Sequence, residues 1–542
     1  MRRLLTLAGL AAGPLLVLGV FFVLPVSGML GEGIWPGGDF SPGAVLDVLA
    51  RPRTHRVLWF TVWSAGLACA LTLLLGIPAA YVLYRLRFPG RGLLRAFFLV
   101  PFVLPTVVVG IAFTQLIEQW GLGFLDDSPW AIIAAMVFFN LAVVVRTVGT
   151  TWESLDPRPG EAAAALGATP WRVFCTVTVP ALRGSMISAA TVVFLFCATA
   201  FGVVLVLGGL RYATVETEIY LLTTNLLDLQ AAAALCLLQL LVVTLLLYAA
   251  HRSRAQASPT LDRRTPSPQR IRRGDLPAVV VTTLVLALVV IPIASLVIGS
   301  FTVDDGWSLA NYRNLDRLGT SDQLEAIRVT DALVNSLRTA FDATWIALLV
   351  GGLVAIIVTR RSHTGTERRL RGVLDGFFML PLGVSAVTLG FGFLITLDQP
   401  TVNFRDSPML VPMAQALVAM PLVVRTIAPV LAGIDDRQRQ AAASLGAGPL
   451  RTVVSIDLAV VWKPLLAAAG FAFAVSLGEF GATSFISRSD HPTLPVVIFQ
   501  LLGQPGQDNY GMALAASVVL AVTTGLVMLA VERLRVPGVG GF

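Results

Sequence analysis

The sequence predicts an all-α, polytopic membrane protein with about twelve transmembrane helices, arranged as two parallel repeats of six. Hydrophobic residues make up 56% of the 542 residues and charged residues only 13%, whereas an ordinary soluble domain carries roughly 25% charged residues. Apolar stretches of about 20 residues, the length of a helix that crosses a bilayer, recur along the chain. In addition, one short polar motif occurs twice.

The predicted spans fall into six before residue 251 and six after residue 275. In the first half they cover 4–25, 57–84, 96–117, 129–150, 183–208 and 229–250, and in the second 276–300, 333–359, 373–397, 408–432, 463–486 and 511–531. The first span resembles a signal peptide, but its apolar run is longer than the roughly 7–15 residues of a signal peptide's apolar region. We therefore expect a retained helix. Pro101, Pro105 and Pro381 lie inside spans and are expected to kink them.

The segment between the halves predicts a linker. "HRSRAQASPTLDRRTPSPQRIRRG", from His251 to Gly274, is rich in Arg, Ser and Pro, a composition typical of flexible connections. The sequence thus divides into a first transmembrane domain (1–250), a cytoplasmic linker (251–275) and a second transmembrane domain (276–542). Six crossings return the chain to its starting side, so the two domains share one orientation, as parallel repeats do.

The arginines predict which side is cytoplasmic. They gather in alternate loops, such as those holding Arg85, Arg87, Arg91 and Arg95, or Arg368, Arg369 and Arg371, while Asp126, Asp127, Glu216 and Glu218 fall in the opposite loops. Arg51, Arg53 and Arg56 fall on the acidic side but are outnumbered. Because arginine-rich loops stay in the cytoplasm, both termini are expected there.

The two halves share motifs in the same order. "EAAAALGATPWRVF" begins at Glu161 and "QAAASLGAGPLRTV" begins 279 residues later, at Gln440. "FFLVP", which ends at Pro101, recurs as "FFMLP", "VVRTV" around Arg146 recurs as "VVRTI", and Phe201-Gly202 recurs as Phe480-Gly481. These matches indicate an ancestral half that was duplicated and fused.

The repeated motif predicts two short helices that meet at an angle. The alanine-rich run from Glu161 to Leu166 favours a helix, and Gly167 can adopt the left-handed conformation that ends one. Thr169-Pro170 then has the residues of an N-cap and a first helical position. Gly446 and Gly448-Pro449 repeat the stop and the restart. The alternative, a helix lying on the membrane surface, is disfavoured because the motif lacks a basic face and apolar anchors.

Residues of this motif resemble the EAA loop of bacterial ABC importer permeases, whose pattern is EAA, a glycine, and then I-x-L-P. The first copy matches it at Glu161-Ala162-Ala163, Gly167, Val177 and Pro180, and the second at Ala441, Ala442, Gly446, Ile456 and Leu458. The second copy departs at Gln440 and Ala459. The resemblance implies the type I importer fold and a loop that docks on a cytoplasmic ATPase through Glu161, Ala162, Ala163, Gly167, Gln440, Ala441, Ala442 and Gly446.

The resemblance also implies partners and a class of substrate. Two fused permease units point to the thiamine and ferric-iron branch, and the segments 204–220 and 476–503 look most like thiamine permeases, with ferric iron as the alternative. Two ATPase subunits, an extracytoplasmic binding protein and a bacterial cytoplasmic membrane are implied.

An energy source is not encoded in this chain. A phosphate-binding P-loop needs G-x-x-x-x-G-K-[ST], but the single lysine, Lys463, lies in "VVWKPLL". We therefore expect no enzyme activity and no cofactor, with ATP and magnesium bound by the partner. The dispersed His and Cys residues predict no metal site. A twelve-helix ion-coupled transporter would not need paired cytoplasmic loops, and a membrane-embedded enzyme would need a catalytic constellation that the spans lack.

Glu479, with Phe480 and Phe201, is the candidate for the substrate pathway or a gate. An ionisable residue within a span is a functional candidate, and the corresponding position of the first half is Ala200. The alternative is a carboxylate near the outer end that makes a local hydrogen bond. Asn140 and Asp342 are expected to hydrogen-bond between helices instead.

Overall fold

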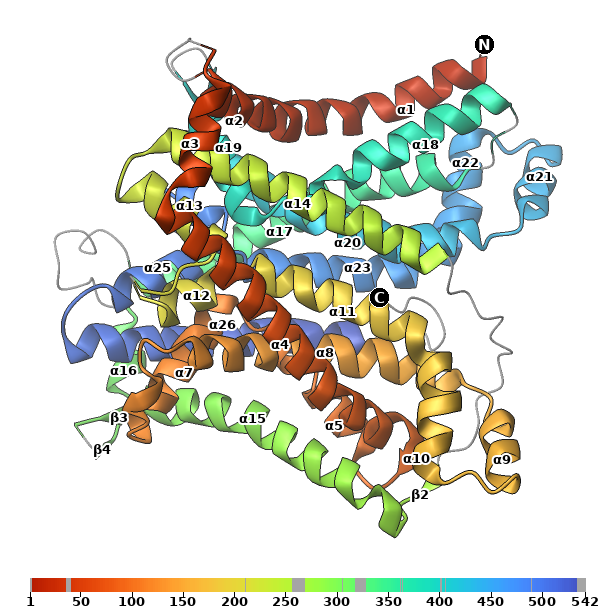
Figure 1. Ribbon diagram of the computed structural model, residues 1–542. Helices are drawn as coiled ribbons and strands as arrows, with labels where there is room; N and C mark the ends of the chain where they lie inside the picture. The colour runs from red at the N-terminus through yellow and green to blue at the C-terminus, as the bar shows by residue number, and fades with distance from the viewer. Residues whose placement is uncertain are drawn as a thin grey trace. The chain divides into compact units, whose positions relative to one another are not determined.

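The protein is almost entirely helical in the computed structural model (Figure 1), which describes residues 2–35, 40–209, 211–255, 269–304, 306–316, 328–360, 362, 364–399, 402–404, 406–488 and 490–533. Residues 256–268 of the predicted linker lie outside these ranges. The strands are two residues long: β1 (Leu86–Arg87) pairs in parallel with β2 (Gln269–Arg270), and antiparallel pairs join β3 (Thr302–Val303) to β4 (Gly306–Trp307) and β5 (Asp398–Gln399) to β6 (Val402–Asn403).

The helices before the linker follow the six predicted spans, with additions. They are α1 (Arg2–Leu18), the π-helix Gly19–Val23, α2 (Leu24–Ile34), α3 (Pro42–Ala50), α4 (Pro52–Arg85), α5 (Arg91–Phe97), α6 (Val100–Val103), α7 (Thr106–Gln119), the 3₁₀ turn Gly123–Leu125, α8 (Pro129–Ser154), α9 (Arg158–Ala165), α10 (Pro170–Val173), the π-helix Phe174–Thr178, α11 (Val179–Ala198), α12 (Gly202–Leu207), α13 (Val215–Thr224) and α14 (Leu229–Ala255).

The helices after the linker repeat this order. They are the 3₁₀ turn Arg273–Asp275, α15 (Leu276–Ser300), α16 (Ala310–Asn314), α17 (Val329–Thr359), α18 (Gly365–Met379), the 3₁₀ turn Leu380–Gly383, α19 (Ala386–Leu397), α20 (Leu410–Ala432), α21 (Asp436–Ser444), α22 (Pro449–Thr452), the π-helix Val453–Asp457, α23 (Leu458–Leu477), α24 (Thr483–Ile486), α25 (Leu494–Leu502) and α26 (Gln507–Arg533). Among the described residues, 10 helices are long and apolar enough to cross a membrane, or up to 11 if a bent pair counts as one span.

Two predicted spans are broken rather than continuous. In 96–117 the axis bends by 101° between Arg91–Val103 and Thr106–Gln119. The break falls at Leu104, which is extended with ψ of 133°, directly before Pro105, because proline disfavours helical backbone in the residue that precedes it. In 373–397, α18 passes into a 3₁₀ turn and α19 begins only at Ala386.

The fifth predicted span of each half also differs from the helices in the structure. Instead of 183–208 and 463–486, the apolar helical segments cover Pro170–Ala198 and Val453–Leu477, and the short helices α12 and α24 follow. The chain turns here because the next glycines allow close packing: a Cβ on Gly202 would lie 2.9 Å from the Val107 backbone nitrogen, and one on Gly481 would lie 2.9 Å from Ala386 Cβ.

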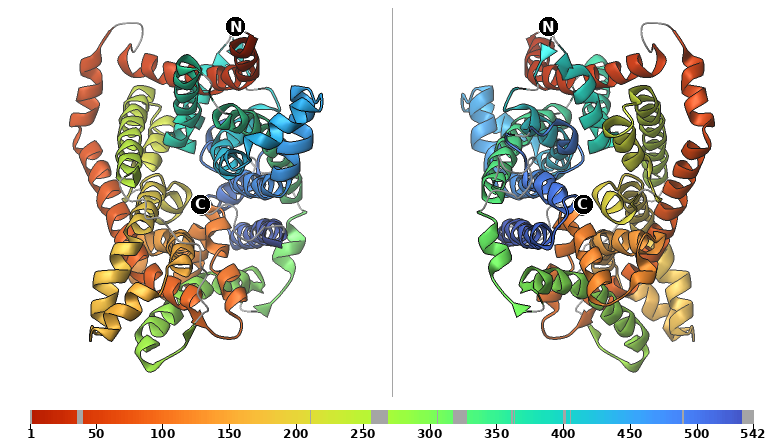
Figure 2. Two further views of the ribbon diagram at one scale, coloured as in Figure 1. Left: turned by 90° about the vertical axis from the view of Figure 1, so that its right-hand side faces the viewer. Right: turned by 90° about the vertical axis from the view of Figure 1, so that its left-hand side faces the viewer.

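The chain divides into two compact units. Unit 1 comprises Met1–Val48, Ile219–Leu237 and Ser300–Phe542, and unit 2 comprises Leu49–Glu218 and Leu238–Gly299. These units differ from the two halves of the sequence because the first helix of each half packs with helices of the other half. In unit 1, α1 and α2 lie along α17 and α19, and in unit 2 the last turn of α15 meets α7, where a Cβ on Gly299 would lie 2.7 Å from Gln115 Cδ (Figures 1 and 2).

Each unit is built around one closely packed helix pair. In unit 2, α4 packs on α8, and a Cβ on Gly76 would lie 2.7 Å from Val144 Cγ1. In unit 1, α17 packs on α20, and a Cβ on Gly351 would lie 3.0 Å from Val423 Cγ1. Val144 and Val423 are 279 residues apart, so the duplication extends to the helix contacts. Small residues at such crossings let membrane helices approach closely.

Candidate functional site

The first EAA-like loop has the predicted helix–stop–helix form. α9 ends at Ala165, and Gly167 has a φ of +82°. The Ala168 N–H donates to the Ala163 carbonyl at 3.1 Å and the Gly167 N–H to the Ala164 carbonyl at 2.9 Å, the bond pair of a Schellman motif. α10 then starts at Pro170. The predicted Gly167 stop is confirmed, as is the Thr169 N-cap, whose hydroxyl accepts from the Arg172 N–H.

The second loop repeats this geometry in unit 1. Gly446 has a φ of +79°, the Ala447 N–H donates to the Ala442 carbonyl at 2.9 Å, and the Gly446 N–H donates to the Ala443 carbonyl at 3.0 Å. α22 follows at Pro449. Each loop leads into a five-residue π-helix at the same offset, a feature the motif did not reveal and one that is frequent at functional sites. Figure 1 shows each pair of short helices, α9 with α10 and α21 with α22.

Each loop exposes apolar side chains, so the expectation that the motif lacks apolar anchors was wrong. Leu166 and Leu445, the corresponding residues at the two helix ends, are each 89% exposed, and Trp171 is 72% exposed. Glu161 and Gln440 are also exposed. The surface around the predicted docking residues thus combines small alanines, a protruding leucine and exposed polar side chains, namely Arg158 and Glu161 in the first loop and Arg437, Gln438 and Gln440 in the second. Such a surface is suited to contact with another protein.

Glu479 lies where α23 has just ended, and it caps the next helix. Its carboxylate accepts the Ala482 N–H at 2.7 Å on Oε1 and the Thr483 N–H at 3.1 Å on Oε2. The side chain is buried. The structure therefore shows the local hydrogen bonding that we considered as the alternative to a pathway role, and the role in substrate passage stays a prediction.

Phe201 and Phe480 occupy corresponding places in unit 2 and unit 1. Both are buried, and each precedes the glycine that packs against the start of α7 or α19. The Phe480 ring lies 5.4 Å from that of Phe499. Their gating role stays a prediction.

Asn140 has the interhelical role expected of it. It lies on α8, is fully buried and donates to the Cys197 sulfur of α11 at 3.2 Å, as well as to the Met136 carbonyl.

Two carboxylates expected in a loop lie instead on a buried helix. Glu216 and Glu218 belong to the first turn of α13. Arg53 donates two hydrogen bonds to Glu218, at 2.5 and 2.9 Å, and Gln239 donates to Glu216. Arg53, one of the three arginines that opposed the predicted orientation, is therefore the partner of a buried glutamate. Counting the charges in each loop cannot reveal that Arg53 pairs with Glu218.

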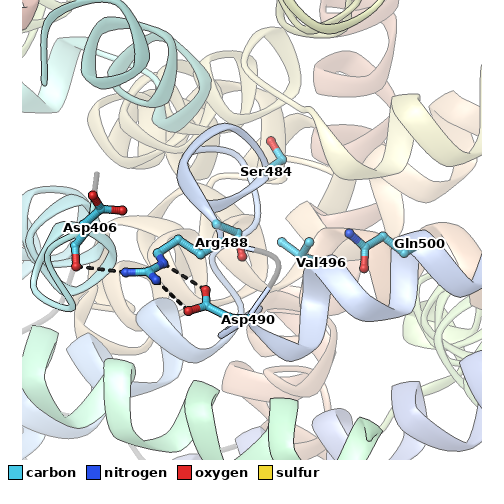
Figure 3. A pocket seen from close by; sticks show the side chains of 7 residues that line it. Asp406, Ser484, Arg488, Asp490, Val496 and Gln500 are labelled. Carbon is cyan, nitrogen blue, oxygen red and sulfur yellow. Dashed lines mark hydrogen bonds and ion pairs between the residues drawn. The ribbon is translucent and has the colours of Figure 1, made fainter. Parts of the chain in front are cut away.

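A polar cavity of about 500 Å³ opens in unit 1 beside α24 and α25 (Figure 3). Arg488 reaches across it and donates to the Asp490 carboxylate at 2.9 and 2.6 Å and to the Asp406 carbonyl at 2.9 Å. The bonds from Arg488 hold the pKa of Asp490 below its usual range. The cavity is lined by Asp406, Ser484, Ser487, Arg488, Asp490, Val496 and Gln500. Six of these residues lie between Ser484 and Gln500, on α24, on α25 and in the loop between them, within the segment 476–503 that resembles thiamine permeases, but the sequence did not predict a cavity there.

Comparison with known proteins places the chain in a family. Residues 72–256 match the family described as binding-protein-dependent transport system inner membrane component. The thiamine transport system permease protein ThiP of Brucella abortus (strain 2308) is 30% identical over 89% of this chain and 88% of its own length. The protein of that name from Escherichia coli (strain K12) is 27% identical over 88% and 89%. The ferric transport system permease protein FbpB of Actinobacillus pleuropneumoniae is 24% identical over 95% and 76%. Together with the many apolar helices and the duplicated EAA-like loops, these similarities show that the chain belongs to the ABC transporter permeases of binding-protein-dependent systems and is a multi-pass transport subunit.

Proposed function

We propose that this permease forms the translocation pathway of an ATP-driven importer for thiamine. The observation that carries the proposal is the agreement between two exposed, duplicated coupling loops and relatives along nearly the whole chain that are named thiamine permeases. Ferric iron is the alternative substrate, because a ferric permease is a more distant relative.

In this proposal the two loops dock on two copies of a cytoplasmic ABC ATPase, which binds ATP and magnesium. Both termini lie in the cytoplasm of a bacterial cell, and an extracytoplasmic binding protein delivers the solute. ATP draws the two ATPase subunits together, the loops follow, and the helices to which they are attached switch the pathway from inward-facing to outward-facing. Hydrolysis resets it. The surface of each loop supports this role, since Leu166 and Leu445 project from it directly after the small-residue runs Ala162–Ala165 and Ala441–Ser444.

Uptake measurements test the substrate. The permease is expressed with its ATPase and binding protein in cells without a thiamine transporter, and labelled thiamine and ferric iron are supplied separately. We expect ATP-dependent thiamine uptake by wild type. We expect none from a variant with both Gly167→Val and Gly446→Val at a matched membrane level, because valine does not tolerate the left-handed stops. Iron uptake without thiamine uptake would contradict the proposed substrate, and uptake by the double variant would contradict the role of the loops.

A further inference from the structure

The second coupling loop is attached to its helices by a buried charge cluster. At its centre is Asp457, the last residue of the π-helix that follows the loop, with a side chain only 2% exposed. Arg360 Nη2, at the end of α17, donates to its Oδ2 at 2.5 Å, and Arg439 Nε, on α21, donates to its Oδ1 at 2.8 Å. The Asp457 carboxylate therefore connects α21 to the end of α17, and Asp457 itself directly precedes α23.

Arg439 extends the attachment. Its Nη1 pairs with Asp436 at 2.9 Å, and its Nη2 donates to the Leu431 carbonyl in the last turn of α20 at 3.2 Å. The Arg439 side chain is 11% exposed. The two aspartates balance the two arginines, so the cluster has no net formal charge. A guanidinium group whose N–H groups bond to several acceptors has a fixed orientation, because the group is planar and rigid.

The first repeat lacks the three residues of this cluster. The residues at the offset of 279 from Asp457, Arg439 and Asp436 are Thr178, Gly160 and Pro157. The ion pair of Arg95 with Glu153, at 2.9 Å, joins α5 to the last turn of α8 and includes no residue of the first loop or its π-helix. Arg85 ends α4 where Arg360 ends α17, and it donates to the carbonyls of Trp152 and Leu155, each at 3.4 Å.

Stacked rings connect the first loop to its helices instead. The Phe174 ring stacks on Trp171 at 5.5 Å and on Trp152 at 6.1 Å between centroids. Stacked rings make no hydrogen bonds to one another, whereas charge-assisted hydrogen bonds are short and directional and are roughly twice as strong as neutral ones. The two loops therefore differ in how firmly they are held.

We propose that Asp457 is a positioning residue that transmits movement of the second coupling helix to α17, α20 and α23. This inference rests on the proposed function of the loops as ATPase-docking elements. The second loop moves as one body with its helices, whereas the first loop is the compliant one. Asp457 occupies the unspecified position of the I-x-L-P pattern, so the EAA resemblance does not assign it a role.

Asp457→Asn tests the proposal in the full complex with its ATPase and binding protein in lipid vesicles. The asparagine keeps the size of the side chain but loses the charge and one of the two acceptor oxygens, so at most one of Arg360 and Arg439 keeps its hydrogen bond and neither keeps its ion pair. We expect the complex to assemble and to hydrolyse ATP, while the ATP consumed per solute imported rises about tenfold, a factor typical of coupling between sites. Asp457→Glu should keep most of the coupling. Thr178→Val, at the corresponding position of the first repeat, is the matched control and should leave the ratio unchanged.

A further variant separates coupling from folding. Replacing Arg360 and Arg439 by methionine and Asp457 by leucine removes every charge that meets Asp457, and such replacements often keep a protein folded. We expect normal assembly with the ratio still raised. A normal ratio in this variant or in Asp457→Asn would overturn the proposal. Failure of wild type to bind the ATPase or to import would refute the proposed function instead, so the two failures are distinguishable.

Discussion

At the scale of single residues, Glu479 is a polar residue in an apolar segment whose carboxylate stabilises the backbone by accepting hydrogen bonds. Between the end of α23 and the start of α24, two backbone N–H groups have no carbonyl partner from the preceding turn, and the carboxylate accepts both. The corresponding Ala200 cannot do this, yet α12 forms after it. The carboxylate is therefore particular to the second repeat, and its cap can be tested apart from transport.

We expect Glu479→Gln to lower the stability of the protein. Glutamine has one acceptor oxygen, so the N–H of either Ala482 or Thr483 loses its partner inside the protein. An unsatisfied buried donor costs roughly 1–3 kcal/mol. Thermal unfolding of the purified protein should show a lower Tm, while Glu118→Gln, at an exposed position of α7, should not change it. Unchanged Tm with reduced thiamine uptake would assign Glu479 to the pathway instead.

At the scale of elements, the helices that we propose to dock on the ATPase depend on the glycine turns that end them. Gly160 and Gly167 lie in the same loop, but only Gly167 has a positive φ, and neither position meets a steric obstacle to a Cβ. Replacement by alanine should therefore be harmful at Gly167 and tolerated at Gly160.

Gly167→Ala should reduce the stimulation of ATP hydrolysis by the binding protein, because a left-handed alanine costs about 1–2 kcal/mol and the turn between α9 and α10 would open. Gly160→Ala should preserve stimulation, since alanine favours a helix interior by about 1 kcal/mol over glycine. The measurement is ATP hydrolysis by the purified complex with and without binding protein. Equal stimulation in the two variants would show that the Gly167 turn is not needed for coupling.

The two coupling helices should also differ in their contribution to assembly. Glu161 offers a charged acceptor where Gln440 offers a neutral one, and hydrogen bonds to charged groups are roughly twice as strong. We expect Glu161→Ala to reduce co-purification with the ATPase more than Gln440→Ala does. Equal losses would mean that the exposed leucines, rather than the polar head groups, dominate docking.

At the scale of the whole molecule, the orientation of the chain can be tested with the natural cysteines. Cys175 is exposed in the π-helix that follows the first loop, whereas Cys69, Cys197 and Cys236 are buried. We expect a membrane-impermeant maleimide to label the full chain in inside-out vesicles and not in right-side-out vesicles, because the arginine-rich loops predict that this side is cytoplasmic. Cys175→Ser should abolish the signal. Labelling of right-side-out vesicles would reverse the predicted topology.

The third and fifth predicted spans of each half differ from the helices in the structure. Hydropathy located the apolar stretches correctly, but it cannot separate a straight helix from two pieces at an angle. Pro105 predicted a kink, and the structure has a 101° bend. The ends of α11 and α23 are decided by glycines that pack against residues about a hundred positions earlier in the chain, which no local window includes.

The sequence by itself determined the membrane class, the duplication and the form of both coupling loops. These follow from composition and from interactions over a few residues, such as the Thr169 cap and the bonds that close the turns at Gly167 and Gly446. Only the tertiary structure decided that α1 and α15 pack with the opposite halves, that Glu218 pairs with Arg53, and that Asp457 joins Arg360 to Arg439. Those contacts connect distant segments, and a buried charge reveals its role only when the partner that compensates its desolvation has been brought beside it.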